Sequence, residues 1–224
     1  MINIIFVGPP GSGKGTQAAM LSQELKIPTI STGEVLRKEV TDASEIGKLA
    51  KSYMESGKLV PDEVVVNIIK NRIVESDCKN GFIVDGFPRN MNQAIVFDDM
   101  LNSLGKKIAI VFNFAVNDEV LIKRISGRFS CKKCGAVYNR YFRLPSAEGV
   151  CDNCGSDQFE SRSDDNEATV QNRLRVYHES TAELIGYYEK KNLLSSVDAL
   201  KSVPFVFGSL IEAVQNFQKI SNNN

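Results

Sequence analysis

Two groups of residues in this sequence have types and spacing that suit chemistry. One is the glycine-rich loop Gly8-Pro-Pro-Gly-Ser-Gly-Lys-Gly-Thr16, which lies between an apolar run at 1–7 and a helical pattern at 17–26. The glycines allow backbone N–H groups to turn inward around an oxyanion, and the helix N-terminus adds partial positive charge. Lys14 supplies a mobile positive charge for β- and γ-phosphates. The loop therefore predicts nucleotide binding.

The loop departs from the generic pattern Gly-x4-Gly-Lys-Ser/Thr at its last position. Gly15 stands where a hydroxyl residue is expected, and Thr16 follows one position later. That hydroxyl usually ligates Mg²⁺. The sequence thus leaves open whether the protein ligates the metal directly.

The second group is a set of four cysteines, Cys131 and Cys134 followed after 16 residues by Cys151 and Cys154. Two Cys-x2-Cys pairs at this separation are typical of a tetrahedral zinc site, although four ordinary thiols in a loop remain the alternative. Four protein ligands leave no open position, so the zinc would be structural and would stabilise a lobe too small for its own core. The fifth cysteine, Cys78, lies far away and is interpreted as a plain thiol.

Composition indicates one substantial globular core. The chain has 224 residues, of which 42% are apolar, and its 27 basic residues balance 27 acidic ones. A neutral chain is unlike a general nucleic-acid binder, which usually carries a basic excess. No apolar run is long enough to cross a bilayer, and the N-terminal run ends in the glycine loop without a basic leader or a cleavage site. We therefore expect a cytoplasmic protein with reduced thiols.

Apolar runs alternate with helical patterns along most of the chain. The runs at 28–31, 81–85, 108–114 and 193–198 predict further strands, and the patterns at 62–76, 90–104 and 118–125 predict helices. This alternation indicates an α/β fold whose parallel sheet is flanked by helices on both faces. Ligands in such folds lie beyond the carboxyl ends of the strands, where Ser31, Asp85 and Ala115 fall.

Two segments interrupt the alternation. The segment 31–60 is polar and helical after its first residues, and 127–164 holds the cysteines among turn and aromatic residues. We therefore divide the chain into a core at 1–30, 61–126 and 165–220, a helical insertion at 31–60, and a small lobe at 127–164. Because the lobe interrupts a nucleotide-binding core, we interpret it as a lid over the phosphates. The tail at 221–224 is expected to fray.

Six arginines stand beside the two interruptions or just past strand ends. A guanidinium binds phosphate oxygens bidentately and stays charged at any working pH, although surface ion pairing is the alternative for each one. They are Arg37, Arg89, Arg124, Arg128, Arg162 and Arg173.

The sequence resembles the adenylate kinases, in their long form with a zinc-binding lid, over nearly the whole chain. The motifs that carry the resemblance are the glycine loop at 8–16, Ser31-Thr-Gly-Glu34 with Arg37, Gly57-Lys-Leu-Val-Pro-Asp62, Asp85-Gly-Phe-Pro-Arg89 with Gln93, Gly127-Arg128, Arg162-Ser-Asp-Asp165, Gln171-Asn-Arg-Leu174 and Leu184-Ile-Gly-Tyr-Tyr188.

This resemblance implies a P-loop nucleoside monophosphate kinase that transfers a phosphoryl group reversibly from Mg·ATP to AMP, giving two ADP. It implies donor contacts at Gly11, Ser12, Gly13, Lys14, Gly15, Thr16, Arg124, Val137, Tyr138 and Lys201. It implies acceptor contacts at Thr32, Arg37, Leu59, Val60, Gly86, Phe87, Pro88, Arg89, Gln93, Arg162 and Arg173. Ala199 stands where the family usually has glycine, which weakens the expectation for Lys201.

The chemistry of the residues agrees with this expectation. Phosphoryl transfer has a loose transition state that is stabilised by positioning and charge, so no general base is required. We assign that charge to Lys14, Arg89, Arg128, Arg162 and Arg173. The single histidine, His178, lies outside every motif and is interpreted as a surface or helix-packing residue.

Three carboxylates have open roles in the sequence. Asp85 either holds water on Mg²⁺ or caps Arg89 as a structural carboxylate. Asp164 and Asp165 either close the lid onto arginines or face solvent.

Two other functions compete. A kinase of UMP or CMP on the same fold would differ in acceptor preference, which depends on Thr32, Gln93 and the region of Leu59 and Val60. A zinc-ribbon protein that binds nucleic acid and uses nucleotide as a switch would show salt-dependent binding, which the neutral charge disfavours. The resemblance also implies a monomer whose ligands are ATP, AMP and ADP, with no nucleic-acid or membrane partner.

Overall fold

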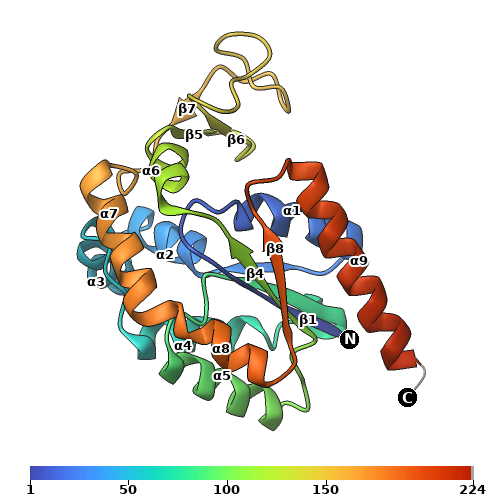
Figure 1. The fold of residues 1–224 in the computed structure, drawn as a ribbon. Coiled ribbons are helices and arrows are strands. Elements are labelled where there is room, and N and C mark those ends of the chain that lie inside the picture. Colours follow the sequence, from blue (N-terminus) through green and yellow to red (C-terminus); the bar gives the residue numbers. More distant parts are fainter. Residues whose placement is uncertain (223–224) are drawn as a thin grey trace.

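The computed structural model describes residues 1–222. Its centre is a five-stranded parallel sheet in the order β2-β3-β1-β4-β8 (Figure 1). The strands are β1 (Ile2–Val7), β2 (Thr29–Ser31), β3 (Gly81–Asp85), β4 (Ile110–Ala115) and β8 (Leu194–Asp198). All neighbouring strands pair in parallel, which confirms the predicted fold class.

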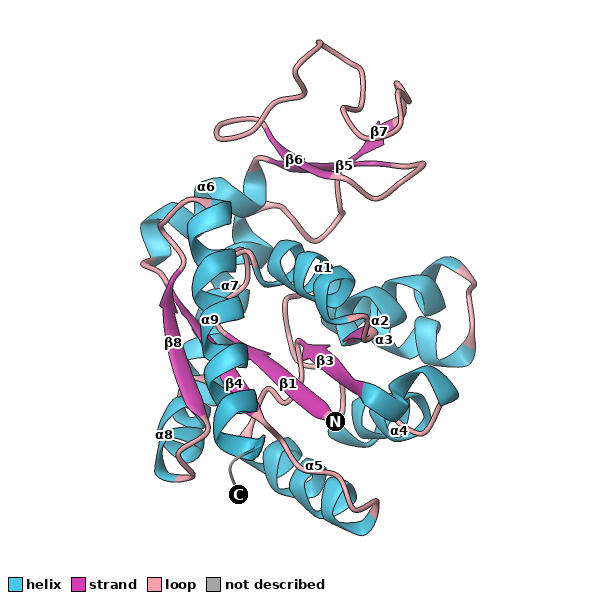
Figure 2. Ribbon diagram, turned by 90° about the vertical axis from the view of Figure 1, so that its right-hand side faces the viewer, coloured by secondary structure: helices cyan, strands magenta, loops and turns pink. Residues whose placement is uncertain are grey.

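Helices cover both faces of the sheet because successive apolar side chains of each strand point to opposite sides. Ile4 and Phe6 of β1 pack towards α1 (Lys14–Leu25) and α9 (Val203–Asn222). Ile5 and Val7 pack towards α4 (Asp62–Arg72), α5 (Met91–Ser103) and α8 (Glu183–Lys190). Figure 2 shows α9 lying across the sheet in front of its strands.

The two interruptions of the alternation form separate structures outside the sheet. The first contains α2 (Thr32–Thr41) and α3 (Glu45–Glu55). The second follows α6 (Asp118–Ser126) and folds as a small antiparallel sheet in the order β6-β5-β7, from β5 (Arg128–Cys131), β6 (Val137–Asn139) and β7 (Phe159–Glu160). In Figure 1 this cysteine lobe projects beyond the carboxyl ends of the core strands.

Element boundaries differ from the sequence predictions in specific places. Helix α1 begins at Lys14, earlier than predicted, directly after Gly13, which has a left-handed conformation. Helix α4 ends at Arg72, and a short 3-10 helix at Ser76–Asn80 follows. Helix α7 (Glu167–Val176) continues through a π-helical stretch at Tyr177–Thr181 into α8.

Helix α9 lies in a region for which the sequence predicted no element, and it runs to Asn222. It therefore includes the first two positions of the tail that was expected to fray, and 223–224 lie outside the described residues. Among residues 1–222, no helix combines the length and the apolarity that membrane crossing requires.

Candidate nucleotide-binding site and metal centre

The glycine loop turns through conformations that favour glycine, and at Gly11 it also packs too closely for a side chain. Gly11 and Gly13 have φ values of +79° and +94°, in the left-handed region that favours glycine. A Cβ atom at Gly11 would lie 2.6 Å from the side chain of Ile125. The loop consequently presents bare backbone ahead of the N-terminus of α1, where N–H groups have no partner within the helix.

Lys14 curls over this loop and lies in a strongly positive environment. Its Nζ donates hydrogen bonds to the carbonyl oxygens of Gly8 and Pro9, both at 2.8 Å. Burial is the main cause that lowers the pKa of Lys14 to about 8; the charge of Asp85 opposes this shift, while nearby arginines, Arg89 foremost, add to it. An ammonium group in such surroundings gains from a bound anion.

A cavity opens between the insertion, the end of β3 and α7. Eight of the residues predicted for the acceptor line it: Thr32, Arg37, Leu59, Val60, Gly86, Arg89, Gln93 and Arg173. The Thr32 hydroxyl donates to the Gly86 carbonyl oxygen at 2.9 Å, which holds the start of α2 against the end of β3. The structure therefore brings most of the predicted acceptor residues into one cavity.

Three predicted acceptor residues are placed differently. Phe87 is fully buried and packs edge-to-face on Phe97, with ring centroids 5.2 Å apart. Pro88 is buried next to it, and neither side chain lines the cavity. Arg162 also lies outside the lining, although its charge acts on Arg37.

Two arginines are paired with buried aspartates at the base of the cysteine lobe. Arg128 donates two hydrogen bonds to Asp165, from Nε to Oδ2 at 2.8 Å and from Nη2 to Oδ1 at 2.5 Å. Arg173 Nη1 lies 3.0 Å from Asp164 Oδ2. Asp164 and Asp165 are 7% and 6% exposed. Both carboxylates therefore close onto arginines and do not face solvent.

Other arginines of the cluster have carboxylates nearby but none in direct contact. Within residues 1–222, Arg37, Arg89 and Arg162 form no ion pair. Burial lowers the pKa of all three, that of Arg37 to about 10, and repulsion from neighbouring arginines adds to the shift. A cluster of half-buried cations without directly paired carboxylates is characteristic of an anion-binding site.

Asp85 lies at the end of β3 beside the glycine loop. A Cβ atom at Gly15 would be 3.7 Å from its Oδ2. Across the described chain Asp85 forms no ion pair with Arg89, whose Nε donates instead to the Gly86 carbonyl oxygen at 2.8 Å. The alternative in which Asp85 caps Arg89 is therefore not what the structure shows.

The predicted donor-base residues are divided between two places. Arg124 donates from Nη1 to the carbonyl oxygen of Ala199 at 3.0 Å, so it lies close to the loop that carries the exposed Lys201. Tyr138 is buried in the cysteine lobe, where its hydroxyl accepts from the Asp152 N–H at 2.8 Å. Its phenol ring is committed to the interior of the lobe, while Val137 is exposed.

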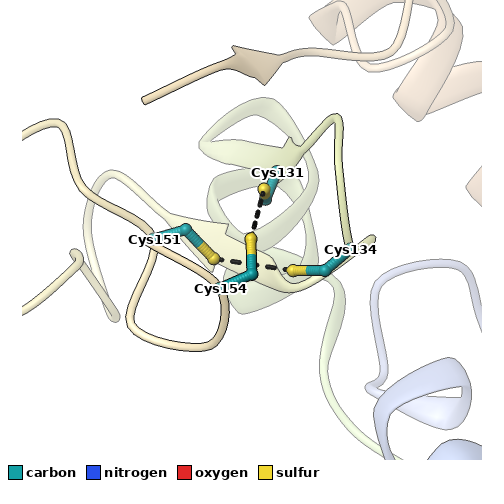
Figure 3. Close-up of side chains that lie close together, drawn as sticks. All are labelled: Cys131, Cys134, Cys151 and Cys154. Atoms are coloured by element: carbon teal, nitrogen blue, oxygen red, sulfur yellow. Dashed lines mark hydrogen bonds between the residues drawn. The ribbon is translucent and has the colours of Figure 1, made fainter. Parts of the chain in front are cut away.

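The four predicted metal ligands converge in the lobe, as Figure 3 shows. All four Sγ atoms lie within 4.8 Å of one another, and the Cys131–Cys154 and Cys134–Cys151 pairs are 3.6 Å apart. Sulfurs bound tetrahedrally to zinc at about 2.3 Å would be about 3.8 Å apart. The cluster therefore has the dimensions of a closed four-thiolate site. Cys78 is buried elsewhere, beside Arg72.

Comparison of the whole chain with known proteins shows which family has this loop, cavity and cysteine lobe. The chain matches the family model "Adenylate kinase" over residues 6–193. It is 49% identical to an adenylate kinase of Archaeoglobus fulgidus over 95% of this chain and 97% of that protein. It is 51% identical to one of Caldicellulosiruptor bescii over 86% of this chain and 89% of that protein. The chain belongs to the adenylate kinase family.

As an adenylate kinase family member, the protein is a nucleoside monophosphate kinase, a phosphotransferase. A relative from Methanosarcina barkeri is 48% identical over 96% of this chain and 100% of its own length, so the match includes the cysteine lobe. The family assignment predicted from the motifs is confirmed. It gives no support to the nucleic-acid-binding switch.

Sequence reasoning did not identify the residues that hold the walls of this kinase's cavity. The Thr181 hydroxyl donates to the Arg89 carbonyl oxygen at 2.7 Å, and Asp62 binds the Gln93 amide. In the sequence, Asp62 is marked only as the last residue of the family motif at 57–62. His178 is exposed and contacts Asp118 at 2.9 Å, a surface position as expected.

Proposed function

We propose that this kinase transfers the γ-phosphoryl group of Mg·ATP reversibly to AMP, giving two ADP. The observation that carries the proposal is the group of half-buried arginines without ion pairs, Arg37, Arg89 and Arg162, at and beside the acceptor cavity. Two nucleotides whose phosphates meet there would supply the missing negative charge. The names of the relatives support ATP and AMP as those nucleotides.

In this proposal the donor phosphates bind the loop at 11–16, and the donor base lies near Arg124 and Lys201. The acceptor binds in the cavity between Thr32, Arg37 and Gln93. Lys14, Arg89, Arg128, Arg162 and Arg173 stabilise the charge on the transferring phosphoryl group. The nucleophile is the acceptor phosphate, which is already ionised, so no protein base is needed.

Two metals have residues suited to hold them. Mg²⁺ bound with the nucleotide would neutralise charge that develops on the phosphates. Asp85 would hold it through water, because Gly15 supplies no hydroxyl next to Lys14. Zinc would be held by Cys131, Cys134, Cys151 and Cys154, where it stabilises the lobe and takes no part in the reaction.

The insertion and the cysteine lobe serve in this proposal as two closing covers, one over each nucleotide. Water competes with AMP as an acceptor, so closure must exclude it before transfer. Both nucleotide sites are built from a single chain, which agrees with a monomer.

The test is a coupled assay of ADP formation with Mg·ATP and, in turn, AMP, UMP, CMP, GMP and no acceptor. Fast ADP formation with AMP alone is the expected result. Preference for UMP or CMP would retain phosphoryl transfer but overturn the acceptor assignment. Rates with every acceptor equal to the control would refute the proposal.

A further inference from the structure

The Gln93 side chain is held in the acceptor cavity by two partners of opposite hydrogen-bonding character. Its Nε2 donates to Asp62 Oδ1 at 2.7 Å, and its Oε1 accepts from the backbone N–H of Arg89 at 2.7 Å. An ionised carboxylate can only accept and a backbone N–H can only donate. The amide consequently has a single allowed orientation, since the reversed one would oppose like groups at both ends.

Asp62 is itself fixed by a network that keeps it ionised. Asn90 donates to its Oδ1 at 3.0 Å and Asn92 to its Oδ2 at 2.8 Å. Burial acts to raise the pKa of Asp62, but hydrogen bonds from Asn92, Gln93 and Asn90 outweigh it and lower that pKa. The group that orients Gln93 is therefore a permanent acceptor near neutral pH.

This arrangement leaves one N–H and one lone pair of the Gln93 amide available to a ligand. Gln93 is 1% exposed and lines the acceptor cavity, so a base in the cavity is the natural partner. The 6-amino group of adenine is a donor and its N1 an acceptor, which match the amide oxygen and N–H. In a 6-oxopurine such as hypoxanthine, O6 accepts and N1–H donates, so the same edge presents the opposite pattern.

We propose, building on the proposed function, that Asp62 is a specificity-determining positioning residue. By fixing the orientation of the Gln93 amide, it makes the acceptor site select 6-aminopurine nucleotides over 6-oxopurine nucleotides. Asp62 does this without touching the substrate.

The test compares kcat/KM for AMP and for IMP at saturating Mg·ATP in the wild type and in Asp62→Asn. Asparagine has nearly the same shape, but it can offer an NH2 as well as an oxygen to Gln93, so the constraint at that end of the amide is lost and only the Arg89 N–H still opposes reversal. We expect the AMP-to-IMP ratio to fall by about tenfold or more, the discrimination typical of one hydrogen-bonded base edge. The KM for ATP should be unchanged. Asp62→Ser, whose hydroxyl also both donates and accepts, should give the same shift and replaces Asp62→Asn if that variant does not fold.

The matched control is Glu63→Gln, which makes the same carboxylate-to-amide change at the next position of α4, where the side chain is exposed. Its AMP-to-IMP ratio should equal that of the wild type. An equal loss of activity towards AMP and IMP in Asp62→Asn would overturn the inference, because that is the result of a general structural role. A wild type inactive with AMP would instead refute the proposed function, so the two failures are distinguishable.

Discussion

Lys14 is the residue through which pH should act on nucleotide binding. Its pKa in the free protein is lowered to about 8, mainly by burial. Bound phosphate favours the charged ammonium and must raise that pKa, so binding above pH 8 requires proton uptake. Affinity for ATP should be constant below about pH 7.5 and weaken by up to about tenfold per pH unit above 8.

Calorimetric titration of ATP in two buffers of different ionisation enthalpy measures this uptake directly. About one proton should be taken up per ATP at pH 9, and almost none at pH 7. Lys14→Arg is the control, because arginine keeps its charge and should show no uptake over this range. Equal uptake in both proteins would assign the effect to another group.

Residues that bind or react were predictable from the sequence where chemistry fixes their spacing. The loop lysine and the two Cys-x2-Cys pairs belong to this class, since few other patterns bring such groups together. Tyr138 was not predictable in the same way: the sequence cannot tell whether a ring faces a ligand or the interior of its own lobe. For the same reason the sequence did not point to Asp62. Its proposed positioning role depends on the 2.7 Å contact between its Oδ1 and the Gln93 Nε2, which only the folded structure shows.

The insertion is attached to α7 at the point from which Arg173 reaches the acceptor cavity. The Thr169 hydroxyl donates to the Glu55 carbonyl oxygen at 2.9 Å, at the end of α3, and Asn172 contacts the Ser56 carbonyl oxygen. A Cβ atom at Gly57 would lie 2.8 Å from the Thr169 carbonyl oxygen, so the approach requires glycine there. These contacts hold the end of the insertion against α7 beside the cavity.

Thr169→Val should weaken the attachment of the insertion to α7, because it removes the hydrogen bond to Glu55 while keeping the shape of the side chain. One neutral hydrogen bond is worth about 0.5–1.5 kcal/mol, so KM for AMP should rise about 2–10-fold. The KM for ATP should change less than about twofold because the donor loop is untouched. Steady-state kinetics with each substrate varied in turn measure both constants.

Thr41→Val is the matched control for this prediction. The Thr41 hydroxyl lies on the same insertion and donates to the Arg37 carbonyl oxygen at 3.0 Å in an exposed position away from α7. It should leave both KM values unchanged. If Thr169→Val raised the two KM values equally, a closing role specific to the acceptor would be wrong.

The cysteine lobe should depend on its proposed zinc ion for stability more than any other part of the molecule does. Its interior consists of Cys131, Cys151 and Tyr138 with a few flanking aromatic side chains, too little to fold independently. Removal of zinc by a chelator should lower Tm; even 3 kcal/mol of lost stability corresponds to about 6–12 °C for a domain of this size. Removal of zinc should affect the turnover number at moderate temperature much less than it affects thermal stability.

Metal content, Tm by calorimetry and activity at 25 °C test this on the same sample. Immediate loss of all activity with an unchanged Tm would contradict a structural role for zinc.

At the level of elements, the sequence predicted those with a strong local pattern. Strand β4 lies where its apolar run predicted it. The carboxyl ends of β2, β3 and β4 also lie where they were expected, at Ser31, Asp85 and Ala115. Helix α9 was not predicted although its apolar residues, from Val203 to Phe217, recur at helical spacing, so the signal was present in the sequence. The π-helical stretch at Tyr177–Thr181, in contrast, has no signature in the sequence.

The molecule as a whole is neutral, yet its charge is strongly segregated. Basic and acidic residues balance at 27 each, while half-buried cations converge from α1, the insertion, the turn after β3, the cysteine lobe and α7. Asp85, Asp164 and Asp165 offset part of their mutual repulsion, and bound phosphate should offset more of it. Stability and ligand charge are therefore coupled across the whole fold.

This coupling predicts that the phosphate group, more than the base, stabilises the protein against heat. At 100 times its Kd, AMP should add about 2.7 kcal/mol, which raises Tm by about 5–10 °C for a domain of this size. Adenosine at the same concentration retains the contacts of the base but lacks the charge, so it should raise Tm by less than about 2 °C. Differential scanning calorimetry of the protein with each ligand makes the comparison. If adenosine stabilised the protein as well as AMP does, the arginine cluster would not be the source of the binding energy, and recognition of the base would have to replace it.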